Sequence, residues 1–250
     1  MFNEHKLKFL HHVTELTDYA KQLGINLKYG QDFAAFRDTL ECQPLRHPIN
    51  PAFDPDRCSL SDESGFWIIG YNSNDEIVHS QAIKLLELDG GTLEQHFERR
   101  LWDFRSHGYE FDRQKCHWHL TPQARSISGT VTYHGELWLK GGPDGCRGGR
   151  LVILLTRLML LKAYLKFSPD FMIGLQAPLS SCRGLGVREG YLRAEQRTIS
   201  WALKDTDQFE EDWMVWMNRE EAEFNLRIPP SFFYEMFEQQ AQDALLKKSA

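Results

Sequence analysis

The sequence predicts an α/β protein of the α+β type, in which helices flank a mixed sheet within a single domain, 1–250. Three observations predict this class. Short apolar or alternating segments bounded by turn residues are typical of strands. They are separated by segments in which apolar residues recur at the helical period. The strand-like segments 66–71 and 77–85 are joined by the turn residues 72–75, which predicts a β-hairpin.

Local signals support the individual elements. Apolar residues from Leu7 to Tyr19 recur every three positions, which indicates one apolar helix face. Thr92 and Gln95 form a capping-box pattern. The segment 150–166 is almost uniformly apolar, so we expect a buried helix. In chain order, the predicted helices are 3–23, 31–42, 92–106, 150–166, 178–189 and 228–244, and the predicted strands are 25–29, 66–71, 77–85, 129–139, 171–176 and 191–203.

The tail has a different composition. The segment 205–223 is rich in Asp and Glu, and we interpret it as a solvated helix face. The alternative is a wall that attracts a cationic amine. We therefore expect a core at 25–203, an N-terminal helical extension at 1–24, and an acidic, helical C-terminal extension at 204–250.

Composition excludes several classes. A formal net charge of −6 argues against a nucleic-acid partner, which would need a basic face. Five cysteines without a CxxC pair argue against a disulfide framework and indicate a reducing compartment. The charged N-terminus does not resemble a signal peptide, and the apolar stretch 151–165 is too short to span a membrane. We expect a cytoplasmic protein that does not bind a membrane.

The strongest chemical signal is the glycine-rich segment 141–149 between a strand and the buried helix. Glycines allow backbone N–H groups to approach a ligand closely, and a helix start adds free N–H donors. Basic residues at Arg147 and Arg150 add to an anion site for phosphates. The alternative is a turn that only reverses the chain. A P-loop is excluded, because no Lys-Ser or Lys-Thr follows these glycines.

From residue 25 to residue 203, the order of elements resembles the GCN5-related N-acetyltransferase (GNAT) superfamily. The hairpin GFWIIGYNSNDEIVHSQAIKL resembles its second and third strands, and GTVTYHGELWL its fourth. GCRGGRLVILLTRL resembles the acyl-CoA pyrophosphate loop and the following helix, with Gly145 and Arg150 as departures from the usual motif. DFMIGLQAP resembles the fifth strand. The resemblance implies a GNAT-like, mixed and largely antiparallel sheet, with acetyl-CoA or another acyl-CoA as co-substrate.

The resemblance also implies where the co-substrate binds. The edge of the fourth strand would pair with the pantetheine arm, and the loop and helix start would hold the pyrophosphate. The residues that the resemblance implies for co-substrate binding are, on the strand edge, Leu137, Trp138 and Leu139, and, in the loop and helix start, Cys146, Arg147, Gly148, Gly149, Arg150 and Leu151.

Three residues are candidates for catalysis. In the family that the sequence resembles, a carboxylate on the fourth strand often accepts the proton of the amine. Glu136 is our first candidate and His134 the second. They lie two apart on a strand, so we expect them on one face. Tyr191 is the nearest tyrosine to the region where the family uses one to protonate the thiolate, although a packing role is the simpler interpretation.

The residues Cys116, His117, His119 and His134 invite a metal interpretation, because His-x-His on a strand places both rings on one face. No second paired ligand motif accompanies it, so we expect no metal site.

The function that we expect is acyl-CoA-dependent N-acyl transfer, with acetyl as the expected group. The acceptor would be a small-molecule amine or a peptide amine, which attacks directly in a ternary complex. One alternative is a catalytically inactive GNAT-like module that binds acyl-CoA or another ligand. A nucleotide-dependent oxidoreductase is a third class, and the run from Gly184 to Gly190 does not fit its dinucleotide fingerprint.

Overall fold

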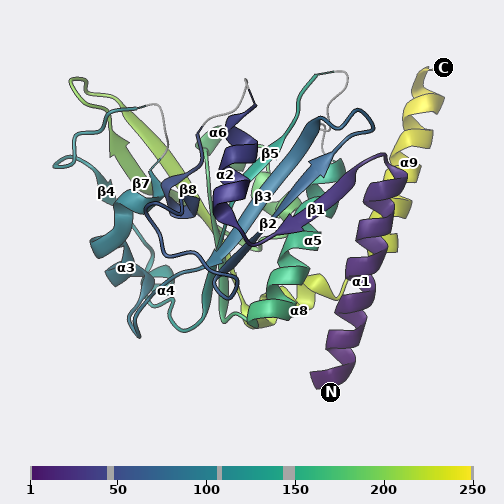
Figure 1. The fold of residues 1–250 in the computed structure, drawn as a ribbon, viewed down its shortest axis with the longest axis horizontal. Helices are drawn as coiled ribbons and strands as arrows, with labels where there is room; N and C mark the ends of the chain where they lie inside the picture. The colour runs from purple at the N-terminus through teal and green to yellow at the C-terminus, as the bar shows by residue number, and fades with distance from the viewer. Residues whose placement is uncertain (1, 44–47, 106–108, 143–149, 249–250) are drawn as a thin grey trace.

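The computed structural model describes residues 2–43, 48–105, 109–142 and 150–248 and contains one sheet whose strand order is β1-β2-β3-β5-β6-β8-β7-β4 (Figure 1). Neighbouring strands are antiparallel, except that β5 and β6 run parallel. The predicted mixed, largely antiparallel sheet is therefore confirmed. The strands are β1 (Asn26–Gly30), β2 (Gly65–Tyr71), β3 (Ile77–Leu85), β4 (His117–Trp118), β5 (Val131–Leu139), β6 (Phe171–Gln176), β7 (Arg193–Ala202) and β8 (Phe209–Asn218).

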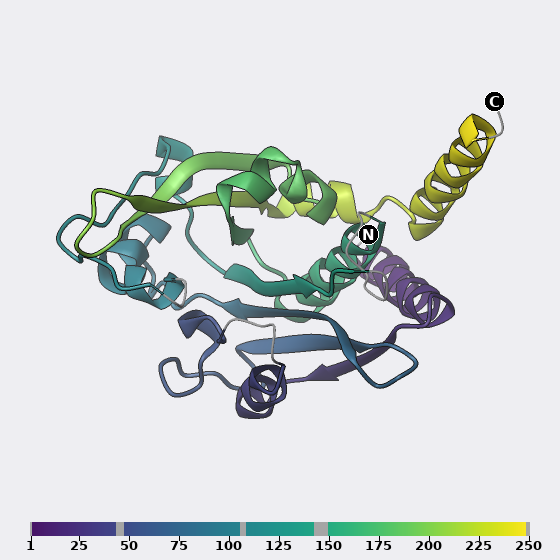
Figure 2. The same cartoon turned by 90° about the horizontal axis from the view of Figure 1, so that it is seen from above.

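Helices cover both faces of the sheet, as Figure 2 shows from above. The α-helices are α1 (Phe2–Gln22), α2 (Phe33–Glu41), α3 (Leu93–Arg100), α4 (Pro122–Arg125), α5 (Arg150–Phe167), α6 (Pro178–Cys182), α7 (Leu185–Glu189), α8 (Arg219–Leu226) and α9 (Pro230–Lys248). Two short 3-10 helices, η1 (Pro51–Phe53) and η2 (Leu101–Phe104), lie in the connections.

Each face of the sheet has its own hydrophobic core. On one face, which we call the η1 face, Phe36 of α2, Phe53 of η1 and Phe97 of α3 pack against Tyr133 and Trp216 of the sheet. On the other, the α5 face, the core is completed by side chains from α1, α5, α8 and α9: Phe9, Leu158, Leu226 and Phe237. β2 is buried on both faces, and its sequence is a nearly continuous apolar run. β3 is also buried, but it carries the polar residues His79, Ser80, Gln81 and Lys84.

The local signals in the N-terminal half are confirmed. The hairpin pairs β2 with β3, and Asp75 takes a positive φ of 58° in its turn. Thr92 accepts from the backbone N–H of Gln95, whose side chain bonds back to Thr92 in the predicted capping box. A buried α5 is confirmed as well.

The prediction for the acidic tail is wrong over 209–218. These residues form β8, which lies between β6 and β7 instead of forming a solvated helix face. The acidic residues Glu210 and Glu211 lie near the start of the strand, while Met214 to Met217 are buried as one apolar run. The sheet therefore extends beyond the expected core boundary at residue 203. The helix that follows is the short α8, capped by Asn218 and Glu221.

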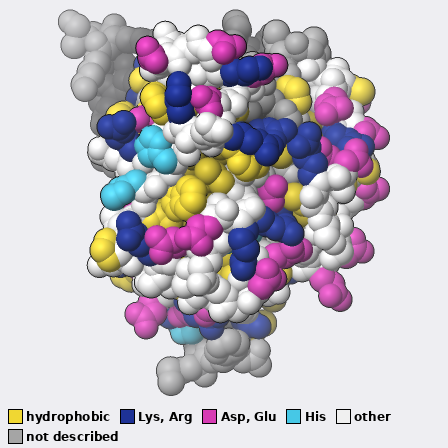
Figure 3. Space-filling view, turned by 90° about the vertical axis from the view of Figure 1, so that its left-hand side faces the viewer, with side chains coloured by type: hydrophobic (Ala, Val, Ile, Leu, Met, Phe, Trp, Pro, Cys, Tyr) yellow, Lys and Arg dark blue, Asp and Glu magenta, His cyan; other side chains and the backbone are white. Residues whose placement is uncertain are grey.

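Charge is mixed on the side of the molecule that carries β4, α3 and α4. Figure 3 shows acidic and basic side chains interspersed there around hydrophobic ones. A surface for nucleic acid would instead gather Lys and Arg on one face. In the described part of the chain, no helix is long and apolar enough to cross a membrane.

Candidate functional site

The parallel strands β5 and β6 stay together for only part of their length. They pair from Val131 and Phe171 up to His134 and Gly174. Beyond this point, β5 continues along β3 as far as Leu139, and β6 continues along β8 as far as Gln176. No ladder joins the two strands there among the described residues. The sheet therefore opens between the C-terminal halves of β5 and β6. Over this stretch, the edge of β5 that faces β6 is not part of a ladder with it.

A β-bulge lies in β5 at the start of this opening. Ala82 of β3 pairs with Gly135 and Ser80 with Trp138, so two residues of β5 face one residue of β3. Glu136 takes a φ of 54° at the bulge, and its carbonyl accepts a hydrogen bond from Ser80 Oγ at 3.0 Å. Gly135 is required there, because a Cβ would lie 2.6 Å from the ring of Phe53. A bulge of this kind re-aims the side chains that follow it.

The expectation that His134 and Glu136 share a face is wrong, and the bulge is the reason. Glu136 Oε1 accepts from the backbone N–H of Asn50 at 2.6 Å, next to η1. His134 Nε2 lies 3.2 Å from Gln81 Oε1, and Gln81 Nε2 donates to the carbonyl of Leu155 in α5. The extra residue interrupts the two-residue alternation, so the carboxylate lies on the η1 face and the imidazole on the α5 face.

A second carboxylate lies on the η1 face. Asp212 of β8 accepts a hydrogen bond from Trp201 Nε1 at 2.8 Å. Burial, with a smaller contribution from Glu210, raises the pKa of Asp212 to about 6. Burial is also the main reason that the pKa of Tyr133 is raised, with additional contributions from the charges of Asp212 and Glu136. This face therefore combines negative charge with an aromatic wall.

His134 and Tyr191 are both buried on the α5 face. Burial lowers the pKa of His134 to about 4, so its imidazole is neutral at pH 7. The rings of His134 and Tyr191 stack with centroids 6.4 Å apart. The Tyr191 hydroxyl donates to the carbonyl of Ile173 at 3.4 Å, and burial raises its pKa. Tyr191 is 2% exposed, so both side chains lie beneath the opening and not at its surface.

A series of hydrogen-bonded polar side chains at the end of β6 has no counterpart in the sequence predictions. Gln176 Nε2 donates to Glu189 Oε2 at 2.6 Å, and Gln176 Oε1 accepts from Ser181 Oγ at 3.1 Å. Burial raises the pKa of Glu189 to about 8, although the hydrogen bond from Gln176 opposes this shift. The sequence carried no signal for this series of hydrogen bonds. Gln176 and Glu189 are thirteen residues apart, and they meet only because α6 and α7 fold back between them.

The co-substrate residues implied by the resemblance divide into two groups. Leu137 and Leu139 of β5 pack with Leu151 of α5 in a small cluster near Val78, while Trp138 packs on the η1 face. Arg150 is the first residue of α5. The implied pyrophosphate residues Cys146, Arg147, Gly148 and Gly149 lie outside the described residues. The structure thus brings the β5 edge and the first turn of α5 together at the opening.

The candidate metal cluster is not assembled. His117 lies in β4, is exposed, and its Nδ1 lies 3.1 Å from the carbonyl of Lys115. Cys116 lies against the backbone of Ala202, and His134 lies in β5 on the buried α5 face. Within the ranges that the structure describes, no group of three or more His, Cys, Asp or Glu is arranged to hold a metal ion.

No family model matches the chain, and no curated protein matches it. Solved structures do resemble it. An aminoglycoside acetyltransferase, AAC(6')-Ib, with coenzyme A and kanamycin, is 13% identical with a TM-score of 0.42, over 80% of this chain and 98% of that chain. FeeM, an N-acyl amino acid synthase from uncultured soil microbes, is 11% identical with a TM-score of 0.45, over 80% of this chain and 93% of that chain.

A third similar structure is the spermidine N-acetyltransferase SpeG chimera from Vibrio cholerae and hSSAT, which is 8% identical with a TM-score of 0.41, over 80% of this chain and 98% of that chain. At these TM-scores, the similarities carry no argument about the fold or the activity of this chain. Over the described residues, the mixed, largely antiparallel sheet and its flanking helices agree with the fold class that the sequence predicted.

Proposed function

We propose that the protein is an acyl-CoA-dependent N-acyltransferase that transfers an acyl group, with acetyl as the expected one, directly to an amine. The observation that carries the proposal is the separation of β5 from β6 beyond His134 and Gly174. An extended pantetheine arm carries amide groups and is narrow enough to pair with a strand edge. The edge of β5 from Leu137 to Leu139 supplies the backbone groups for this pairing.

The start of α5 supports the placement of the pyrophosphate. α5 follows the glycine-rich segment and begins at Arg150, and its first N–H groups have no partner within the helix. These donors and the positive end of the helix dipole favour an anion. Leu137 and Leu151 pack around the same cluster, which keeps this helix start close to the β5 edge.

Glu136 is the proposed general base. Its carboxylate accepts a proton from the amine, directly or through one water, as the amine nitrogen forms its bond to the thioester carbonyl carbon. The tetrahedral intermediate then collapses, the carbon–sulfur bond breaks, and the thiolate leaves and takes a proton from solvent. Glu136 releases the proton of the amine to solvent. His134 and Tyr191 are buried on the opposite face, so we assign them to packing beneath the opening and not to proton transfer.

The charge of the η1 face favours an amine as acceptor. Glu136 and Asp212 both act on the phenol of Tyr133, so two carboxylates share this region. Together they attract an ammonium group from solution.

One observation supports the non-catalytic alternative. Glu136 already accepts a hydrogen bond from the backbone of Asn50, so its carboxylate has a role in holding the segment before η1. In that case, the opening would bind acyl-CoA without turnover, and the protein would be a ligand-binding module.

Isothermal titration of the purified protein with acetyl-CoA, CoA and NAD tests the proposal. We expect micromolar binding of acetyl-CoA, no binding of NAD, and loss of acetyl-CoA binding in Gly148→Glu. Gln208→Glu, at an exposed position, adds the same charge elsewhere and should bind normally. A screen of polyamines, amino acids, aminoglycosides and peptide amines then follows thiol release. No binding of acetyl-CoA, CoA or a longer acyl-CoA would overturn the proposal, and binding without turnover would favour the ligand-binding module.

A further inference from the structure

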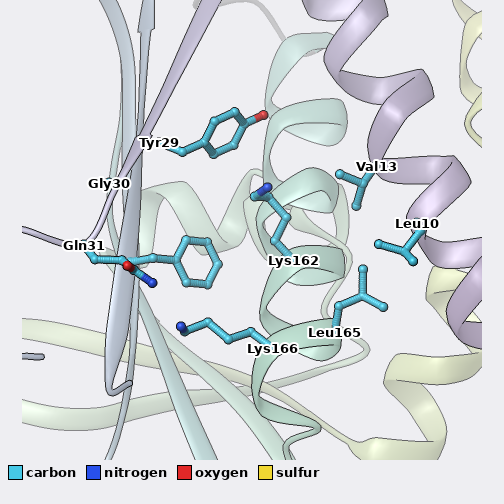
Figure 4. Close-up of a pocket in the computed structure, with 9 residues that line it drawn as sticks. Leu10, Val13, Tyr29, Gly30, Gln31, Lys162, Leu165 and Lys166 are labelled. Atoms are coloured by element: carbon cyan, nitrogen blue, oxygen red, sulfur yellow. The ribbon is translucent and has the colours of Figure 1, made fainter. Parts of the chain in front are cut away.

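A cavity lies on the α5 face, away from the opening between β5 and β6. It has a volume of about 490 Å³ and lies where α1, α5 and the edge strand β1 meet. Its lining residues are Leu10, Val13, Tyr29, Gly30, Gln31, Phe66, Lys162, Leu165 and Lys166 (Figure 4). The cavity volume is in the range of small-molecule sites. Lys162 is twelve residues, or about 18 Å, along α5 from Arg150, so this cavity is distinct from the proposed acyl-CoA site.

The walls of this cavity differ in character. Leu10 and Val13 of α1 and Leu165 of α5 form an apolar side, which Figure 4 shows opposite Tyr29 and Gln31. Leu10 is 52% exposed, although it lies on a helix that packs against α5. Exposed apolar side chains at the mouth of a cavity are typical of sites that take an apolar ligand group.

Two lysines extend from α5 into the cavity. Lys162 Nζ lies 4.1 Å from the centre of the Tyr29 ring. Lys166 Nζ donates to the carbonyl of Asp62 at 2.6 Å and lies 5.5 Å from the centre of the Phe167 ring. Within the described residues, neither lysine has a carboxylate at ion-pair distance. Lys162 is half-buried, and this burial lowers its pKa, because an ammonium group loses hydration there.

We infer that this cavity binds a single-chain amphipathic anion, such as a fatty acid, with its carboxylate on Lys162 and Lys166 and its alkyl chain against Leu10, Val13 and Leu165. An anionic head would supply the opposite charge that both ammonium groups lack among the described residues. An apolar tail would remove Leu10 and its neighbours from water. A small hydrophilic anion would leave this apolar wall in water, and a neutral lipid would leave the lysines unpaired. The inference does not depend on the proposed acyl transfer.

Titration of the intact protein with dodecanoate, below the concentration at which it forms micelles, tests this site. We expect one saturable site, an affinity that rises about threefold to fourfold with each methylene from octanoate to dodecanoate, and no change with saturating CoA. Dodecanol and dodecyltrimethylammonium should bind at least tenfold more weakly, because they lack the carboxylate.

Paired variants locate the site. Lys162→Gln and Lys166→Gln should each weaken dodecanoate binding about tenfold, and Lys204→Gln, which removes the same charge at an exposed position, should not. Leu10→Trp should weaken binding by filling the cavity, whereas Leu7→Trp, on the same helix but outside the lining, should not. Wild-type affinity in both lysine variants, loss of dodecanoate binding with CoA, or binding only to phosphatidylglycerol vesicles would overturn the inference.

Discussion

His134 and Glu136 are two residues apart on β5, yet their side chains lie on opposite faces of the sheet. The bulge at Glu136, with its φ of 54°, inserts the extra residue that reverses the alternation. It separates a buried neutral imidazole from a carboxylate that lies beside η1. The surroundings of the two candidate residues therefore differ, although their spacing in the sequence predicted one shared face.

Glu136→Gln should lower the turnover number of acyl transfer at least 100-fold and leave acetyl-CoA binding within about twofold. The amide oxygen of Gln can still accept from Asn50 N–H, so the fold and the segment before η1 should be preserved. Steady-state kinetics and titration calorimetry on the same preparation measure both effects. Glu110→Gln, at an exposed carboxylate, is the control. Unchanged turnover in Glu136→Gln would exclude this carboxylate as the base.

Tyr191→Phe should retain turnover, because the hydroxyl is buried and donates only to the carbonyl of Ile173. We expect a stability loss of about 1 kcal/mol, typical of one hydrogen bond. Tyr191→Ala should cost about 3–5 kcal/mol, because it leaves a cavity in the core of the α5 face. Urea unfolding and pH–rate profiles of both variants are the measurements. A drop in turnover with loss of the basic limb of the profile in Tyr191→Phe would instead identify Tyr191 as the proton donor to the thiolate.

Glu189 should make the protein less stable as the pH rises above neutrality. Its pKa is about 8 in the folded protein, above its ordinary value of 4.5, so the native state holds a proton that the unfolded state has lost. Its contribution to the free energy of unfolding is fully present below about pH 4.5 and is lost as the pH rises through about 8. Between these pH values, the free energy of unfolding falls by roughly 1.4 kcal/mol per pH unit.

The difference in slope between the wild type and Glu189→Gln from pH 6.5 to 8 isolates this effect, because the shifted groups His134 and Asp212 contribute equally to both proteins. Glu189→Gln should flatten the pH dependence of urea unfolding there and keep the hydrogen bond from Gln176. Glu98→Gln, at an exposed position of α3, should leave the wild-type slope. An unchanged slope in Glu189→Gln would show that Glu189 is ionised in the native state.

Gly135→Ala should destabilise the protein by about 1–3 kcal/mol, since overpacking in a filled core forces side chains out of place. The added Cβ would lie 2.6 Å from the Phe53 ring, which is fully buried and stacks on Tyr133 with ring centroids 5.4 Å apart. Phe53→Leu in the same chain should recover part of the loss, which a double-mutant cycle measures. Additive effects of the two changes would show that Gly135 and Phe53 are not coupled.

The hairpin and the Thr92 cap were predictable, because their signals lie within a few neighbouring residues. The acidic tail was not. Glu210, Glu211 and Asp212 suggested a solvated helix, but the apolar run that follows them is buried between β6 and β7. Burial by strands distant in sequence overrode the local composition, as often happens with strand propensity.

The candidate site was predictable to the level of the strand. Sequence identified the strand β5 and the buried helix α5, because their apolar patterns lie on either side of a glycine-rich segment. The role of Glu136 was implied by the family resemblance and stays a prediction. The sequence could not identify the bulge, since neither Gly135 nor Glu136 signals an extra residue without knowledge of the partner strand β3. It also missed the chain from Ser181 through Gln176 to Glu189, whose members meet only in the folded protein.

By itself, the sequence determined the order and type of most elements, because apolar periodicity, caps and turns act between residues close along the chain. Only the tertiary structure decided three further features: which face each side chain of β5 occupies, where β5 separates from β6, and which ionisable groups are buried. These depend on partners many residues away. Strand register and desolvation are set by those partners, so the pKa values of His134 and Glu189 follow from the fold and not from their sequence neighbours.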